Sequence, residues 1–392
     1  MKKPQPLNAN SLRYDIDFAV PQRHRLRFTQ DCFGAEFDVV RELFESHAGS
    51  PARLQIWCDE GLCDFDRGLT RRLENQFGSA TELELVDQVR TLPGGELIKN
   101  DASYVNGLLE SFNENDLDRR SYVVVIGGGA VLDTVGYAAA VAHRGIRLIR
   151  FPTTTLAQAD SGVGVKNAVN WFDKKNWKGT FATPWAVIND YGLLTGLSDR
   201  DFRCGFSEAV KVALLKDKDF FAFLSQRATE IAQRNQLDAS EAIRKSVLLH
   251  LDHITRGGDP FESREARPLD FGHWSAHKLE ALTDFEVRHG EAVSIGIAVD
   301  VAYSQLKLGL PAEVTTQTLS ILQQLYLPTW HTAPDEDVIF DGLEEFRQHL
   351  GGRLTITLLT DVGSPIDVHE IDRGAMREAI AMAAQAAGIV RS

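Results

Sequence analysis

The chain of 392 residues is poor in cysteine, and the few cysteines it has are scattered. The four are Cys32, Cys58, Cys63 and Cys204. They supply neither a paired zinc spacing nor a disulfide scaffold, which predicts reduced thiols in a cytoplasmic protein. The chain also lacks an apolar run near the roughly 18 residues of a membrane span, and no apolar segment follows the N-terminal lysines. We therefore expect neither a membrane partner nor a secretory signal.

The chain also has fewer positively than negatively charged residues. Lysine and arginine number 42 against 55 aspartates and glutamates, which gives a formal net charge of −13. This balance repels the phosphate backbone of nucleic acids, so general nucleic-acid binding is excluded. With 43% hydrophobic and 25% charged residues, the composition is that of a soluble globular protein, and its length suits two domains.

Two patterns of hydrophobicity divide the chain. From about residue 52, short apolar runs alternate with helical patterns, which predicts β-α units around a mainly parallel sheet. After about residue 197, apolar residues recur every three or four positions, which predicts mostly helices. We therefore expect an α/β domain over residues 1–197 and a mostly helical domain over residues 198–392. The first fifty residues, including the basic segment at residues 23–27, are either an added strand region or a dimer element.

A glycine loop is the first candidate for a binding site. A buried-strand run, Tyr122–Ile126, leads into Gly127, Gly128 and Gly129 and then into a helical pattern. Backbone N–H groups at such a helix start can approach a pyrophosphate closely. The alternative is a tight turn without a ligand, because the glycines do not form the Gly-x-Gly-x-x-Gly fingerprint. Asp133, with a second polar loop at residues 152–155, favours a nucleotide.

Histidines form the second candidate site. His273, His277 and His289 lie close together in the sequence, and a spacing of four puts the first two on one helix face. Glu208 is a candidate carboxylate from another helix. Taken singly, each histidine is better explained as a capped or solvent-facing residue, but as a cluster beside a nucleotide loop they favour a metal site. Glutamate with two histidines suits zinc, and equally cobalt or manganese.

A lysine-rich segment is the third candidate. Residues 160–176 combine glycines and amide side chains with Lys166, Lys174 and Lys175. In an acidic protein, such a cationic patch suits a phosphate group, because ammonium and amide donors satisfy its oxygens. The alternative is a solvated turn.

Taken in order, these motifs resemble one known family. The sugar phosphate cyclases, whose best-known members are the 3-dehydroquinate synthases, carry a similar series: GGGAVLDTVGYAAA, HRG, PTTTLAQADSGVGVK, KKN, SEAVK, LDFGHWSAHKLE and HGEAVSIGIAVD. The resemblance runs from about Asp59 to Leu359. It implies an N-terminal Rossmann-like NAD-binding domain with a parallel sheet, a C-terminal mostly α-helical metal-binding domain, and a homodimer. The implied cofactors are NAD and a divalent metal, Zn²⁺ with Co²⁺ as the alternative.

The resemblance also assigns residues to roles. Positions that would contact NAD, the first glycine of the loop included, are Asp59, Glu96, Lys99, Gly127, Gly128, Gly129, Asp133, Thr153, Thr154, Asp160 and Lys175. The metal would be held by Glu208, His273 and His289. Catalytic positions around the substrate and its phosphate would be Lys166, Asn176, Lys211, His277 and Arg144. His277 would then lie beside the phosphate and not on the metal, and Arg144 would reach into the neighbouring subunit's site.

The chemistry implied by the resemblance is a cyclisation. Bound NAD oxidises a secondary alcohol, the adjacent C–H becomes acidic, and phosphate leaves by elimination. The cofactor then returns the hydride, the ring opens, and an intramolecular aldol step closes a carbocycle. The metal acts as a Lewis acid and template, and NAD is regenerated within the cycle.

The sequence departs from the synthase pattern where those enzymes bind a substrate carboxylate. Ala266 stands at an arginine position, Asp270 at an asparagine and His250 at a lysine, while Arg347 keeps the charge of a late lysine. Without these two cations, binding of a substrate carboxylate should lose several kcal/mol of charge-assisted hydrogen bonding. We therefore expect a cyclase acting on sedoheptulose 7-phosphate to give a valiolone-type C7 cyclitol, similar to the 2-epi-valiolone synthases. Arg267 could restore a carboxylate contact.

Three alternatives stay open. The first is a divergent 3-dehydroquinate synthase acting on 3-deoxy-arabino-heptulosonate 7-phosphate. The second is a metal-dependent NAD polyol or alcohol dehydrogenase, which would not need the phosphate-binding positions Lys166, Asn176, Lys211 and His277. The third is a cofactor-binding regulatory protein, which retention of all three metal-ligand positions disfavours.

Overall fold

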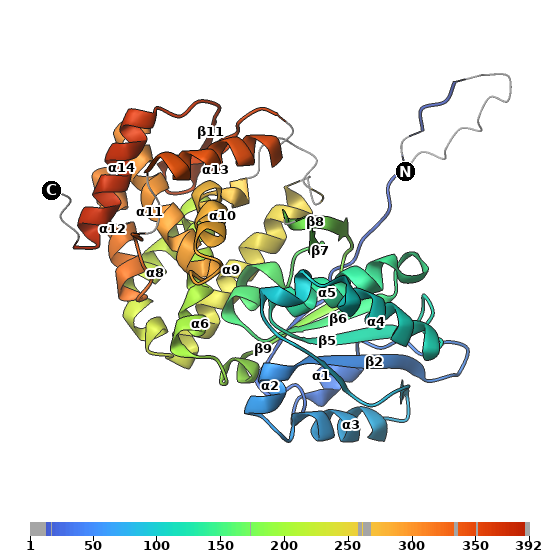
Figure 1. The fold of residues 1–392 in the computed structure, drawn as a ribbon. Helices are drawn as coiled ribbons and strands as arrows, with labels where there is room; N and C mark the ends of the chain where they lie inside the picture. The colour runs from blue at the N-terminus through green and yellow to red at the C-terminus, as the bar shows by residue number, and fades with distance from the viewer. Residues whose placement is uncertain are drawn as a thin grey trace, which may run out of the picture.

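The computed structural model describes residues 13–16, 18–172, 174–257, 261, 268–332, 336–349 and 352–388. Figure 1 shows two parts side by side, an N-terminal part built on a sheet and a C-terminal part built of helices. This confirms the predicted α/β fold with a parallel sheet followed by a helical half. The last strand of the sheet ends at Asp190 and the next α-helix begins at Asp199, so the division predicted at 197/198 falls between them.

The sheet of the N-terminal part is parallel throughout. Its strand order is β1 (Leu26–Thr29), β9 (Ala186–Asp190), β6 (Arg147–Pro152), β5 (Tyr122–Gly127), β2 (Ala52–Asp59) and β3 (Leu83–Leu85), and β4 (Arg90–Leu92) also pairs with β2. Every residue of β5 is buried. Such a continuous apolar run is typical of a strand that is covered on both faces.

Alternation along β5 distributes its side chains to two cores. Tyr122, Val124 and Ile126 pack with α1 (Phe37–Arg41) and α3 (Leu69–Ser79). The two intervening valines of β5 pack with α4 (Ala102–Glu114) and α5 (Gly129–Val141) on the other face. Because all strands run the same way, the loops after β2, β5 and β6 meet at one edge, which is where α/β sheets bind ligands.

The basic segment near the N-terminus leads into a strand, β1, which begins at Leu26. Leu26 of β1 pairs with Val187 of β9, and the four residues of β1 extend the sheet at its edge. Of the two possibilities left open for the first fifty residues, an added strand is therefore present, and a dimer contact stays a prediction.

The C-terminal part is a helical assembly around α11. Its helices are α6 (Asp199–Cys204), α7 (Phe206–Lys216), α8 (Lys218–Ala232), α9 (Gln236–Arg256), α10 (His273–Leu282), α11 (His289–Leu308), α12 (Ala312–Gln324), α13 (Glu336–His349) and α14 (Arg373–Ala386). Helix α11 packs against α7, α10, α12 and α14. Within the described ranges, no helix combines the length and the hydropathy that crossing a membrane requires.

Two antiparallel hairpins depart from the predicted pattern. In the helical half, β10 (Ile356–Asp361) pairs with β11 (Ser364–Val368), although this half was expected to be mostly helical. In the N-terminal half, the lysine-rich segment forms β7 (Lys166–Trp171) and β8 (Lys174–Phe181), so it is not simply a solvated turn. Short apolar runs of about six residues fit either a strand or part of a helix, because periodicity needs a longer window to show itself.

Candidate active site

The glycine loop lies where the strand ends meet. Gly128 is the N-cap of α5 and provides no side chain to cap it, so the first N–H groups of the helix can bind an anion. A Cβ at Gly128 would lie 3.3 Å from Cγ2 of Thr154, and a Cβ at Gly127 would lie 3.4 Å from Cβ of Asp59. The backbone N–H of Thr153 donates to the carbonyl of Gly127. The two predicted loops and Asp59 are therefore brought together at one edge.

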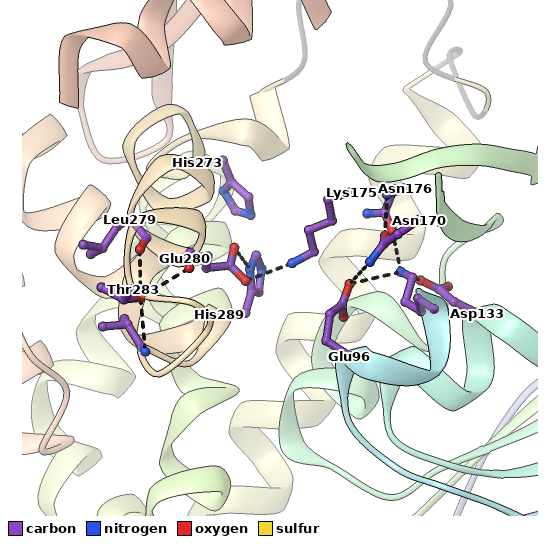
Figure 2. A network of polar contacts seen from close by, with 12 residues as sticks. Glu96, Asp133, Asn170, Lys175, Asn176, His273, Leu279, Glu280, Thr283 and His289 are labelled. Atoms are coloured by element: carbon purple, nitrogen blue, oxygen red, sulfur yellow. Dashed lines mark hydrogen bonds and ion pairs between the residues drawn. The ribbon is translucent and has the colours of Figure 1, made fainter. Parts of the chain in front are cut away.

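A buried lysine organises the polar side of this edge. The ammonium of Lys99 lies 2.7 Å from Asp133 and 4.0 Å from Glu96, and it also bonds Asn176. Figure 2 labels these three partners. Asn170, which the sequence reasoning did not single out, donates to Glu96 at 3.3 Å and accepts from the backbone N–H of Asn176 at 2.8 Å. Four residues assigned by resemblance thus form one network, and Asn170 ties β7 and β8 into it.

The predicted metal residues converge from three helices. Glu208 lies on α7, and His273 and His289 are the first residues of α10 and α11. One oxygen of Glu208 lies 3.6 Å from Nε2 of each histidine, and the three ligand atoms lie within 4.8 Å of one another. Apart from an ion pair with Lys211, neither oxygen of this buried carboxylate finds a hydrogen-bond donor in the described part of the chain. A divalent cation fits between these atoms.

The other nitrogen of each imidazole has a partner of its own. Nδ1 of His273 lies 3.0 Å from the carbonyl oxygen of Phe271, and Nδ1 of His289 lies 3.0 Å from a carboxylate oxygen of Glu280. Burial disfavours the charged form of His289, but Glu280 and Glu208 raise its pKa to about 9. A cation bound beside Glu208 would displace the proton from Nε2, and both acceptors would then hold the remaining ring proton on Nδ1, which is the tautomer that a metal ligand needs. Sequence reasoning missed Glu280, because nothing in the motif HWSAHKLEAL distinguishes it from an ordinary helix glutamate.

A second group of metal-binding atoms shares His289. His277, Glu280 and His289 also lie within 4.8 Å of one another. However, both oxygens of Glu280 are already engaged, one by Lys175 at 2.8 Å and the other by His289. In Glu208 only one oxygen is engaged, by Lys211, and the other faces both histidines, so the first group is the better cation site. The placing of His277 beside a phosphate stays a prediction.

Lys211 is surrounded by carboxylates. Burial disfavours its charged form, but Glu208, Asp160 and Asp270 raise its pKa above the usual value. Asp160 in turn lies 2.7 Å from Nδ1 of His250 on α9. Burial opposes ionisation of Asp160, yet His250 and Lys211 lower its pKa to about 2. A residue predicted to bind cofactor and one predicted to bind substrate are thus in direct contact.

An arginine that the sequence reasoning passed over holds the loop that carries Lys166. Arg150 of β6 is fully buried, and its guanidinium donates to the carbonyls of Gly162, Gly164 and Lys166 and to the side chain of Asn167. Burial lowers its pKa to about 10, so it remains a cation at neutral pH. The loop is therefore shaped by a charged group beneath it.

A buried aspartate holds the start of α10. Asp300 of α11 accepts from the backbone N–H of Gly272 at 2.9 Å and from Nε1 of Trp274 at 2.8 Å. Gly272 has a φ of 76°, which favours glycine. A Cβ on Gly296 of α11 would lie 1.9 Å from the carbonyl oxygen of Gly272, so the two backbones approach closely. Because His273 lies between these two donors, Asp300 fixes the backbone that positions a metal-site histidine.

This aspartate predicts a pH-dependent stability. Burial raises the pKa of Asp300 to about 7, although Trp274 and Gly272 favour the ionised form. The pKa of an unfolded aspartate is about 3.9. The folded protein therefore binds a proton on Asp300 more tightly than the unfolded chain does. This contribution to stability is complete below about pH 3.9 and is lost as the pH rises through about 7. Relative to wild type, the free energy of unfolding of Asp300→Asn should therefore increase by more than about 1 kcal/mol between about pH 5 and pH 8.

Urea unfolding at both pH values measures this difference. Asp341→Asn, an exposed position on α13, is the matched control and should keep the same offset from wild type at both. A constant offset for Asp300→Asn as well would contradict the prediction.

Some predicted residues lie away from this cluster. Arg144 is exposed in the turn after α5, at the sheet edge opposite the glycine loop, so its role in a partner's site stays a prediction. Arg347 contacts Glu344 and the carbonyl of Gly352. Arg267 lies outside the described residues, as does Ala266.

Comparison with known proteins decides the family. The model described as 3-dehydroquinate synthase N-terminal matches residues 89–204, and the one described as 3-dehydroquinate synthase C-terminal matches residues 205–347. A 3-dehydroquinate synthase from Campylobacter fetus subsp. fetus (strain 82-40) is 33% identical over 296 residues, or 74% of this chain and 82% of that one. This chain belongs to the 3-dehydroquinate synthase-like sugar phosphate cyclases. It is an enzyme of that family.

Other relatives of this cyclase carry two different names. A 2-epi-valiolone synthase from Actinosynnema mirum is 33% identical over 282 residues, covering 70% of this chain and 72% of that one. A 3-dehydroquinate synthase from Cereibacter sphaeroides (strain ATCC 17029 / ATH 2.4.9) is 38% identical over 234 residues, which span 59% of this chain and 62% of that one. Sequence identity alone therefore does not separate the two substrates.

Solved structures share the fold. A 2-epi-5-epi-valiolone synthase from Streptomyces hygroscopicus subsp. jinggangensis 5008, with NAD⁺ and Zn²⁺ bound, matches 95% of this cyclase and 99% of its own chain with a TM-score of 0.84 at 23% identity. A 2-deoxy-scyllo-inosose synthase complexed with carbaglucose-6-phosphate, NAD⁺ and Co²⁺ gives a TM-score of 0.76 at 22% identity, covering 91% and 95% of the two chains. An NADH-dependent butanol dehydrogenase from Thermotoga maritima gives 0.64 at 14% identity, covering 94% and 98%.

Proposed function

We propose that the protein is a sugar phosphate cyclase that converts sedoheptulose 7-phosphate into a valiolone-type C7 cyclitol, with NAD and a divalent metal, Zn²⁺ or Co²⁺, as cofactors. The observation that carries the substrate choice is the charge around Lys211. Glu208, Asp160 and Asp270 all act on this one buried ammonium, and His250 contacts Asp160. Within the described residues, these carboxylates compensate the charge of Lys211, so its ammonium is not available to bind a substrate carboxylate.

The residues present fit both cofactors. The buried carboxylate of Glu208, whose one oxygen faces both histidines while the other is ion-paired with Lys211, and the two imidazole Nε2 atoms suit a divalent cation. The glycine loop, Lys99 and Asp133 lie at the strand-end edge of the sheet and supply polar groups suited to a dinucleotide. When bound, NAD supplies a temporary hydride acceptor, and the metal supplies a Lewis acid for neighbouring substrate oxygens.

The chain's own residues orient the sugar phosphate and stabilise its leaving group. Lys166, Asn176 and His277 supply donors for phosphate oxygens, on which charge increases as the C–O bond breaks. Lys211 is held charged by its carboxylate neighbours, and it can donate to a substrate hydroxyl beside Glu208. Hydroxyl groups suit Asp270 and His250, since they can both donate and accept hydrogen bonds.

A second substrate has support of its own. Relatives with similar identity are named 3-dehydroquinate synthase, so 3-deoxy-arabino-heptulosonate 7-phosphate is the alternative.

We would assay phosphate release by zinc- and NAD-loaded protein with each of the two sugar phosphates. Release from sedoheptulose 7-phosphate alone, with a cyclitol in the NMR spectrum, supports the proposal. Release from the heptulosonate alone supports the alternative. NADH accumulation with simple polyols, without phosphate release, would replace both with a dehydrogenase.

Asp270 provides a test of specificity within one chain. Asp270→Asn removes a negative charge that acts on Lys211, so the ratio of kcat/KM for the heptulosonate to kcat/KM for sedoheptulose 7-phosphate should rise about tenfold, equivalent to about 1.4 kcal/mol. Steady-state assays with both substrates give this ratio. Asp64→Asn, at an exposed position on α2 (Glu60–Phe65), should leave this ratio unchanged. An unchanged ratio in Asp270→Asn would remove Asp270 from substrate selection.

A further inference from the structure

Glu280 joins the two halves of the active site. It is 3% exposed, lies on α10, and has no role in the proposed function. One of its oxygens accepts from Lys175 of β8 at 2.8 Å, and the other lies 3.0 Å from Nδ1 of His289 on α11 (Figure 2). A single carboxylate thus touches a cofactor-side lysine and a metal-side histidine.

We propose that Glu280 is a positioning residue that couples metal binding to dinucleotide binding, so that each ligand tightens the other. The inference rests on the proposed function only in taking the two ligands to be a divalent metal and NAD. It adds that the two sites communicate through one side chain.

The metal side of the coupling is the orientation of His289. The hydroxyl of Thr283 donates to the carbonyl of Leu279 at 2.9 Å and accepts from the backbone N–H of Val287 at 3.4 Å. These bonds hold the turn between α10 and α11, so Glu280 and His289 keep a fixed relation. A carboxylate that accepts the Nδ1 proton fixes the imidazole and makes its Nε2 a stronger ligand.

The cofactor side is the charge of Lys175. Its ammonium neutralises Glu280 in the structure, which weakens the carboxylate as an acceptor for His289. The pyrophosphate of a dinucleotide is an anion that competes for the same ammonium. When it draws Lys175 away, Glu280 becomes a stronger acceptor, and His289 a stronger metal ligand. Because linkage is reciprocal, bound metal must strengthen dinucleotide binding by the same factor.

The test measures binding and needs no sugar phosphate. The Kd for Zn²⁺ of metal-free full-length protein is measured by competition with a chromophoric chelator, with and without saturating NAD⁺. The Kd for NAD⁺ is measured by calorimetry with and without Zn²⁺. In the wild type we expect each ligand to tighten the other by the same factor, about fivefold or more.

Two variants approach the coupling from opposite sides. Glu280→Gln should weaken Zn²⁺ binding about 10- to 100-fold and reduce the coupling factor to near one. Lys175→Met should tighten Zn²⁺ binding in the absence of NAD⁺ and should also abolish the coupling. Glu286→Gln removes a charge from an exposed position in the same turn and is the matched control, so it should keep the wild-type coupling.

The outcomes separate this inference from the proposed function. Coupling that survives in Glu280→Gln, or a wild type that binds both ligands independently, would overturn the inference and leave the proposed function standing. A wild type that binds no metal or no NAD⁺ would overturn both. If Glu280→Gln fails to fold, Lys175→Met still decides, because unchanged coupling in that variant contradicts the proposal.

Discussion

Replacing Glu208 with glutamine is expected to lower phosphate release about a thousandfold or more and to leave the purified protein without its equivalent of zinc. Glu208 is the only carboxylate facing both His273 and His289 within the described residues, and its oxygens lack other hydrogen-bond donors. Glutamine keeps the shape but removes the negative charge, so a divalent cation loses its anionic ligand. Losing several kcal/mol of Lewis-acid stabilisation corresponds to about a thousandfold in rate.

Zinc content by mass spectrometry, alongside the phosphate-release assay, measures both effects. Lys211 loses its buried counter-charge in this variant, so circular dichroism should accompany the assays to establish folding. Glu313→Gln, at an exposed position in the first turn of α12, is the control and should retain zinc and activity. A Glu208→Gln protein that is folded, retains zinc and works within tenfold of wild type would show that the metal is held elsewhere.

Arg150→Met is expected to lower the free energy of unfolding by about 3–5 kcal/mol, the range for breaking a buried charged network. Methionine fills a similar volume but donates no hydrogen bond, so the carbonyls of Gly162, Gly164 and Lys166 lose their donor. Each unsatisfied buried acceptor costs about 1–3 kcal/mol, and rearrangement of the loop recovers part of this. Because Lys166 lies at the end of this loop, activity should fall as well.

Urea denaturation followed by fluorescence gives the stability difference. Arg244→Met is the control: its ion pair with Glu241 is on the surface of α9, so it should change stability by less than about 1 kcal/mol. A loss below about 1 kcal/mol for Arg150→Met would mean that the loop keeps its shape without the guanidinium.

The sequence was most informative where function depends on short, contiguous segments. The run Tyr122–Ile126 followed by three glycines predicts a buried strand, a tight turn and a helix start, because each of these follows from local residue chemistry. The order of motifs resembling the sugar phosphate cyclases was also readable, and the family comparisons confirm it. The sequence also predicts Glu208, His273 and His289 as metal ligands, and the structure brings their ligand atoms together.

The sequence was least informative where one short pattern fits two structures. The run Ile356–Asp361 pairs as strand β10 within a half expected to be mostly helical. The lysine-rich segment could be a phosphate loop or a solvated turn, and it forms the hairpin of β7 and β8. In both cases pairing with the strand that follows in the chain decides the conformation, because β-propensity depends strongly on the contacts that a strand makes with its neighbours.

What the sequence by itself determined is therefore the fold class, the family and the residue types available for chemistry. Only the tertiary structure decided which of those residues meet. Asp160 contacts His250, Glu280 joins Lys175 to His289, and Arg150 holds the loop before Lys166. The physical reason is that these contacts join segments far apart in the chain or separated by turns. Their geometry depends on how helices and strands pack against one another, and no local spacing records that packing.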